Sequence, residues 1–153
     1  MKKSANIHGI ISLLLIFDAI AVALVSIGQQ SMLMAGIYLF LFILALVVIA
    51  VTYCTKCICR NNCHHLIIGW LSRKLSKPKP SNYTTNDLIF GVVLPFLPVI
   101  VIPQFYLYQN MLHFILYWLL LGISVAEVTF YVCKGCRNTK CAMCRTKQFA
   151  KQN

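Results

Sequence analysis

Four apolar stretches dominate this chain and leave little room for anything else. They run over residues 9–27, 32–53, 88–108 and 111–132. Each is close to the length of a membrane-spanning helix, which needs about 20 mostly apolar residues. Only 11% of the 153 residues are charged, compared with about 25% in a soluble domain. The sequence therefore predicts an all-α membrane protein with four transmembrane helices and no separate soluble domain.

Two very short polar turns join the apolar stretches in pairs. Residues 28–31 connect the first and second stretches, and Gln109-Asn110 connects the third and fourth. Such short connections place consecutive helices side by side and antiparallel. We therefore expect two antiparallel helical hairpins.

All eight cysteines lie in two clusters, one after the second stretch and one after the fourth. The members are Cys54, Cys57, Cys59 and Cys63 in the first cluster, and Cys133, Cys136, Cys141 and Cys144 in the second. The leading CxxC pairs of the two clusters are separated by the same 79 residues. This offset predicts a pseudo-repeat whose pseudo-two-fold axis along the membrane normal brings the two clusters close together.

The chain accordingly divides into three regions. Residues 1–65 form the first transmembrane hairpin with its cysteine cluster, and residues 87–153 form the second hairpin, its cluster and a basic tail. Between them, residues 66–86 form an interfacial amphipathic segment and a linker. Residues 66–71 are apolar and include Trp70, and residues 72–75 are basic, as in a short helix that lies in the membrane interface.

The third stretch contains its own capping and distortion signals. Thr85 or Asn86 can cap its first turn, with Asp87 close to the positive end of the helix. Three prolines follow: Pro95, Pro98 and Pro103. Each removes a backbone donor, so we expect a distorted helix.

The basic residues predict the orientation in the membrane. All 14 Lys and Arg lie at the N-terminus, between the second and third stretches, or after the fourth. The positive-inside rule then places both termini and both cysteine clusters in the cytoplasm. The net charge of +11 favours contact with anionic lipid headgroups rather than nucleic acid, because no soluble fold displays the basic residues. A cleaved signal peptide is the alternative for the first stretch, but its length and Asp18 favour a retained helix.

Metal ligation is the preferred interpretation of the cysteine clusters. The cytoplasm is reducing, so structural disulfides are not expected there. Lys and Arg are interleaved with the cysteines, and nearby cations stabilise the thiolate form that binds metal. Redox-active dithiols and palmitoylated cysteines are the alternatives.

The cysteine spacing slightly favours iron–sulfur clusters of the 4Fe–4S type over zinc. The first cluster differs by one residue from a known iron–sulfur run, whereas structural zinc sites usually have a longer spacer between their two CxxC pairs. His64 and His65 are candidate auxiliary ligands, and a site shared between the leading CxxC pairs of both clusters stays open. No haem is expected, because His8 lies at the inner end of the first stretch and His113 at the outer end of the fourth, so they cannot bind one haem together.

The chain has only three acidic residues, and two of them fall within apolar stretches. Asp18 lies near the middle of the first, where a charged carboxylate is costly, so we expect it to face the bundle interior. Together with Gln104 and Glu127 it forms a candidate proton or quinone site. Structural alternatives are an interhelical hydrogen bond for Asp18 to Ser12, Ser124, Thr129 or Gln104, and an interfacial ion pair for Glu127 with Lys134 or Arg137.

The function expected from these features is electron transfer. Iron–sulfur clusters at the cytoplasmic face would exchange electrons with a membrane quinone or a redox partner protein. One alternative is a zinc-stabilised membrane scaffold or assembly protein. Another is a soft-metal transporter or sensor, because thioethers and imidazole suit Cu(I); its ligands would be Met32, Met34, Met111 and His113. The sequence does not decide whether the protein is an enzyme.

Overall fold

The computed structural model describes residues 2–57, 66–77 and 84–132, and every regular element in these ranges is helical. The elements are α1 Lys2–Gly28, α2 Met32–Thr52, η1 Cys54–Lys56, α3 Leu66–Leu75, α4 Thr85–Leu88, η3 Ile89–Val93, α5 Leu94–Leu107, α6 Met111–Glu127 and η4 Val128–Val132. Of these, η1 is a 3₁₀ turn, and η3 and η4 are π-helical. The all-α prediction is confirmed for the described part of the chain.

Within the described ranges, four helices are long and apolar enough to cross a membrane. They are Ile7–Gly28, Met32–Lys56, Thr85–Leu107 and Met111–Val132. Their outer surfaces expose large apolar side chains such as Phe40, Phe90 and Phe105, which suit a lipid environment. The number and position of these helices agree with the sequence prediction of a multi-pass membrane protein.

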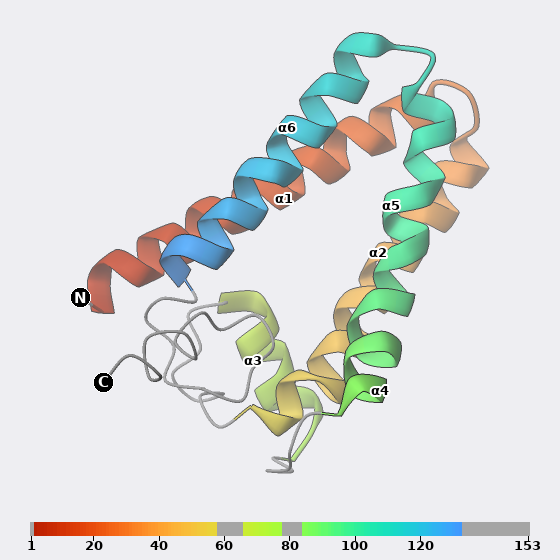
Figure 1. Cartoon of the computed structure of the whole chain (residues 1–153). Helices are drawn as coiled ribbons and strands as arrows, with labels where there is room; N and C mark the ends of the chain where they lie inside the picture. Colours follow the sequence, from red (N-terminus) through yellow and green to blue (C-terminus); the bar gives the residue numbers. More distant parts are fainter. Residues whose placement is uncertain (1, 58–65, 78–83, 133–153) are drawn as a thin grey trace.

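The long helices form two arms that meet near the two short turns and diverge toward α3 (Figure 1). One arm consists of α1 packed against α6, and the other of α2 packed against α5. The most extensive packing therefore joins the first half of the chain to the second, while the division into two hairpin units stays a prediction. We call the two ends of the bundle the turn end and the α3 end.

Polar contacts extend along the whole α1–α6 interface. They join His8 to Glu127 at 2.7 Å, Ser124 Oγ to the carbonyl of Ser12 at 3.0 Å, and Ser26 to His113 at 2.9 Å. Between these contacts along α1, the small residues Ala19 and Ala23 are fully buried in the core. Small residues and interhelical hydrogen bonds are the usual means of association in lipid, where the hydrophobic effect does not drive helices together.

A carbonyl group in α5 is hydrogen-bonded by both neighbouring helices. Pro103 has no N–H, so the carbonyl of Val99, four residues earlier, loses its helical donor. The hydroxyls of Tyr38 in α2 and Tyr117 in α6 both donate to this oxygen, at 3.2 and 3.3 Å. Both tyrosines are buried. The carbonyl that the proline releases thus joins three helices.

Matching features of the two halves recur 79 residues apart. The pairs are Met32 and Met111, which begin α2 and α6; Ser31 and Asn110, their N-caps; and the buried tyrosines Tyr38 and Tyr117. At the turn end, the side chains of Gln30 and Gln109 hydrogen-bond to each other at 3.0 and 3.4 Å. This is the offset that separates the leading cysteine pairs.

The third span is irregular, as its prolines predict. It begins with α4, continues as π-helical η3 and becomes α-helical at Leu94. In the π-helical segment, the N–H of Leu94 bonds to the carbonyl of Ile89, five residues earlier. Pro95 follows immediately, so the wide turn falls where a proline interrupts the α-helical pattern.

The short helix predicted for residues 66–75 is present as α3. It packs against α2 at the α3 end (Figure 1). Trp70 is half exposed. Lys74 Nζ lies 4.7 Å from the centroid of the Trp70 ring, which makes a cation–π contact. Its location in a membrane interface stays a prediction.

Gly91 marks the closest approach of the third span to α2. A Cβ atom at this position would lie 2.8 Å from Thr52 Oγ1 and 3.5 Å from Thr52 Cβ. Thr52 has little freedom to move away, because its hydroxyl donates to the carbonyl of Val48 at 2.6 Å. Glycine therefore permits this contact between η3 and α2.

We expect the double variant Tyr38→Phe, Tyr117→Phe to lose about 1–3 kcal/mol of unfolding free energy, the usual cost of an unsatisfied buried polar group. Each single variant should lose less, because the other hydroxyl still donates to Val99. Unfolding by denaturant in detergent micelles measures these differences.

Pro103→Ala provides the decisive control for this prediction, because it returns an N–H to the carbonyl of Val99. It should reduce the loss in the double variant. Tyr108→Phe, at an exposed tyrosine, should have no effect. Additive losses without rescue by Pro103→Ala would contradict the shared role of the two hydroxyls.

Gly91→Ala should destabilise the bundle by about 1–3 kcal/mol, the range for overpacking a close contact. Gly36→Ala and Gly122→Ala are matched controls, since nothing lies within 4 Å of a Cβ atom at either position. The same unfolding measurement applies. Equal stability of all three variants would show that η3 and α2 do not approach so closely.

Candidate functional site

The first CxxC motif forms a tight turn directly after α2. Cys54 begins the 3₁₀ segment η1, and Cys57 follows it in an extended conformation. The N–H of Cys57 donates to the carbonyl of Cys54 at 3.2 Å, so a hydrogen bond joins the first and last residues of the motif. Both cysteines are partly exposed. The motif thus lies at the α3 end of the bundle, at the end of a span.

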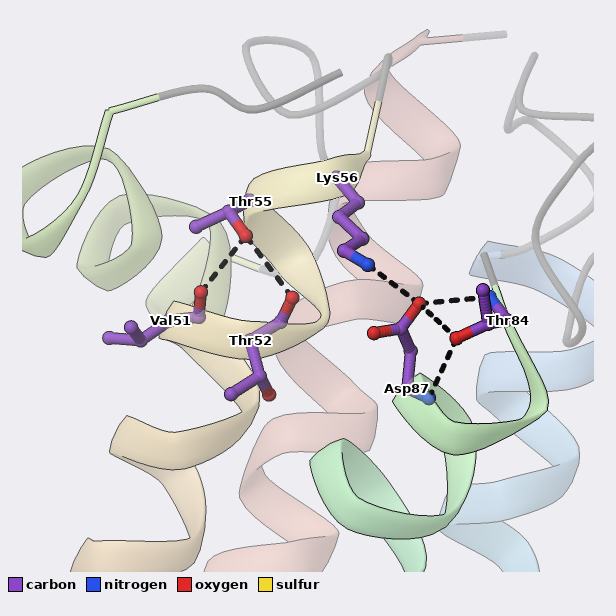
Figure 2. A network of polar contacts seen from close by, with 6 residues as sticks. All are labelled: Val51, Thr52, Thr55, Lys56, Thr84 and Asp87. Atoms are coloured by element: carbon purple, nitrogen blue, oxygen red, sulfur yellow. Dashed lines mark hydrogen bonds and ion pairs between the residues drawn. The ribbon is translucent and has the colours of Figure 1, made fainter. Parts of the chain in front are cut away.

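Thr55 attaches this turn to α2. Its hydroxyl is within hydrogen-bond distance of the carbonyls of Val51, at 2.9 Å, and Thr52, at 3.1 Å (Figure 2). These carbonyls belong to the last turn of α2. The last carbonyls of a helix have no N–H partner within the helix, so the hydroxyl of Thr55 can bind them. Because Thr55 is buried, the middle of the motif packs inward.

Lys56 attaches the turn to the third span. Its Nζ lies 2.7 Å from Asp87 Oδ2, and the same oxygen accepts hydrogen bonds from the backbone N–H of Thr84 at 2.8 Å and from its hydroxyl at 2.9 Å (Figure 2). In return, the Thr84 hydroxyl accepts from the N–H of Asp87, which completes a capping box. The ends of α2 and α4 are therefore joined through one carboxylate.

This arrangement corrects the expected cap of the third span. Thr84 is the N-cap, rather than Thr85 or Asn86. The physical reason is the capping box, which requires the acid to stand three residues after the cap, and Asp87 stands three residues after Thr84. Because the same carboxylate binds Lys56, this lysine is already paired with an acid and is less available to offset thiolate charge.

The other candidate ligands lie outside the described residues. They are Cys59, Cys63, Cys133, Cys136, Cys141 and Cys144, together with His64 and His65. Within the described ranges, no group of three or more His, Cys, Asp or Glu side chains comes together in a way that could hold a metal ion. Cys54 and Cys57 are two of the expected ligands, and metal binding stays a prediction.

Two of the three residues of the expected proton or quinone site contact other residues. Glu127 pairs with His8 in α1, and the His8 ring stacks on Tyr131 with 4.3 Å between centroids. Gln104 accepts a hydrogen bond from Trp118 Nε1 at 3.0 Å. No hydrogen bond or ion pair joins either residue to Asp18, so the described contacts do not form one pocket from the three.

The expectation that Asp18 faces the bundle interior is wrong. Asp18 is exposed, whereas the next two residues, Ala19 and Ile20, are buried in the core. Its expected hydrogen-bond partners have other contacts: Ser12 bonds to Gly9 and accepts from Ser124, and Thr129 bonds to Val125. The inward stripe of α1 simply does not include position 18.

The structure also describes the surroundings of the candidate soft-metal ligands at the turn end. Met32 and Met111 are largely exposed, and His113 is hydrogen-bonded to Ser26. Sequence reasoning overlooked two other groups, His8 as partner of Glu127 and the tyrosine pair on the Val99 carbonyl. The 79-residue offset was the signal that relates Tyr38 to Tyr117.

Comparison with known proteins adds no relative: no family model, no curated protein and no solved structure matches this chain. The function is therefore argued from the residues and their geometry alone.

Replacing Asp87 with Ala should loosen the CxxC turn and the start of α4 together. Hydrogen exchange should accelerate by about three- to tenfold at the amides of Lys56, Cys57 and Asp87, because the capping box and the ion pair are lost in one step. Asn86→Ala is the control, since Asn86 is exposed beside the same cap. Faster exchange at α4 alone would show that Lys56 does not couple the two segments.

Proposed function

We propose that this protein is an integral membrane metal-binding protein whose cysteines hold metal at one membrane face. The observation that supports this is the fixed CxxC turn at the end of α2. Thr55 anchors its middle and Lys56 is tied to Asp87, while Cys54 and Cys57 are partly exposed. A pair of thiols preorganised in this way suits metal ligation, which requires little further ordering of the backbone.

In the proposed arrangement, the two halves are related hairpins, and their cysteine clusters follow the second and fourth spans. The orientation comes from the sequence: the basic residues place both termini and both clusters on the cytoplasmic side. Anionic lipid headgroups would contact the basic residues at this face. Proximity of the clusters would permit either two separate sites or one shared site.

The proposed metal centre is an iron–sulfur cluster in each half, because the first cysteine run comes within one residue of a known iron–sulfur spacing. Each cluster would accept and release one electron. The electrons would be exchanged with a membrane quinone or with a redox partner protein.

Zinc is the second candidate, and it too has a specific observation in its favour. The CxxC turn is tied to the end of α2 and to the start of α4, as expected where a metal would pin helix ends together. A structural zinc with four thiolates needs no electron partner. In this version, the protein is a metal-stabilised membrane scaffold.

Elemental analysis and an absorption spectrum after anaerobic purification test the proposal. The iron–sulfur version predicts a brown protein with about four irons and four sulfides per cluster. The variant Cys54→Ser, Cys57→Ser should lose at least half of the metal, whereas Met32→Ser, at the opposite end of the bundle, should retain it.

The outcomes of this measurement separate the candidates. A colourless protein with stoichiometric zinc that depends on Cys54 and Cys57 would exclude electron transfer and support the scaffold. Loss of metal in Met32→Ser would instead favour the soft-metal site. A protein without bound metal, even after reconstitution with iron and sulfide or with zinc, would overturn the proposal.

A further inference from the structure

Asp18 occupies an unusual position for a carboxylate. It stands eleven residues after Ile7 and ten residues before Gly28, the ends of the first span. At 1.5 Å per residue, it is about 15 Å from either end, near the middle of a hydrocarbon layer. It is nevertheless exposed.

The outer face of α1 around Asp18 is otherwise apolar. Spaced three or four residues apart, its exposed members are Ile7, Ile11, Leu14, Asp18, Ala21 and Val25. Residues with this spacing share one side of a helix. The opposite side, with Ala19, Ile20 and Ala23, is buried against the rest of the bundle. One side of α1 therefore presents a single acid at the centre of an apolar stripe.

Nothing within the described part of the chain pairs with this acid. Asp18 has no hydrogen bond or ion pair there. The lysines and arginines of the sequence lie before, between and after the apolar stretches, so none reaches mid-membrane depth. An acid in this position is expected to pair with a cation or hydrogen-bond donor at the same depth, because exposure of a charge to lipid is strongly unfavourable.

We propose that this face of α1 binds a transmembrane helix of another protein that has a Lys or Arg near its midpoint. Charge complementarity specifies this partner. A second copy of this chain has no Lys or Arg at this depth, and in a symmetric contact through this face it would place another carboxylate opposite Asp18. Ala21, one turn from Asp18, lets a partner helix approach closely. The proposal does not depend on the metal site, because Asp18 lies in the middle of α1 whereas the CxxC turn follows α2.

The test uses a designed peptide as a defined probe. It is a helix of about 20 Leu and Ala residues with one central Lys, reconstituted with the full chain in phosphatidylcholine vesicles. Energy transfer between labelled peptide and labelled chain should show at least about tenfold tighter binding than for a peptide with central Leu.

Variants of the chain identify the group responsible. Asp18→Leu should abolish the preference for the Lys peptide, and Asp18→Asn should reduce it, because the amide retains polarity without charge. Leu97→Ala is the matched control: Leu97 is an exposed residue of α5, 79 positions after Asp18, and its change should leave binding intact.

Photo-crosslinking then tests the face. A benzophenone side chain at Ala21 should crosslink to the Lys peptide, and one at Phe105, exposed on α5, should not. Equal binding of the Lys and Leu peptides, or crosslinks that favour Phe105, would overturn the proposal. Self-association that depends on Asp18, without preference for the Lys peptide, would also overturn it and assign the face to a second copy.

Discussion

The organisation of this bundle depends on the hydrogen bonds of one backbone carbonyl. Within a membrane no water is present to satisfy a carbonyl that a proline has released, so neighbouring helices must provide the donor. Pro103 releases the carbonyl of Val99, and Tyr38 and Tyr117 bind it from α2 and α6. The third span is thereby joined to helices from both halves of the chain.

The arms and their joints explain where the candidate metal site lies. The α1–α6 arm is held by polar contacts that extend from His8 to Ser26, and η3, which precedes α5 in the third span, approaches α2 closely at Gly91. Away from the turn end the arms diverge, and the ion pair of Lys56 with Asp87 joins α2 to α4 there. The cysteine turn is therefore part of the connection between helix ends, which suits a metal centre that depends on their relative position.

Length and composition predicted the four spans and α3, because apolar runs and an amphipathic segment are local properties of the sequence. The distortion of the third span was predictable from its prolines for the same reason. The orientation of Asp18 was not, since α1 is apolar on nearly every side and its pattern does not mark the inner face. The pairing of Glu127 with His8 depends on which helices meet, information that sequence spacing does not contain. The cap at Thr84 was missed by one residue, although its acid three positions later was visible.

The infrared absorption of the Val99 carbonyl, labelled with ¹³C and ¹⁸O, tests the central claim most directly, because its stretching frequency reports on the hydrogen bonds it accepts. The account predicts that the labelled band moves to higher wavenumber in two steps, first in Tyr38→Phe or Tyr117→Phe and then further in the double variant. A band that stays in place in all three variants would contradict the account, because it would show that neither hydroxyl binds this oxygen.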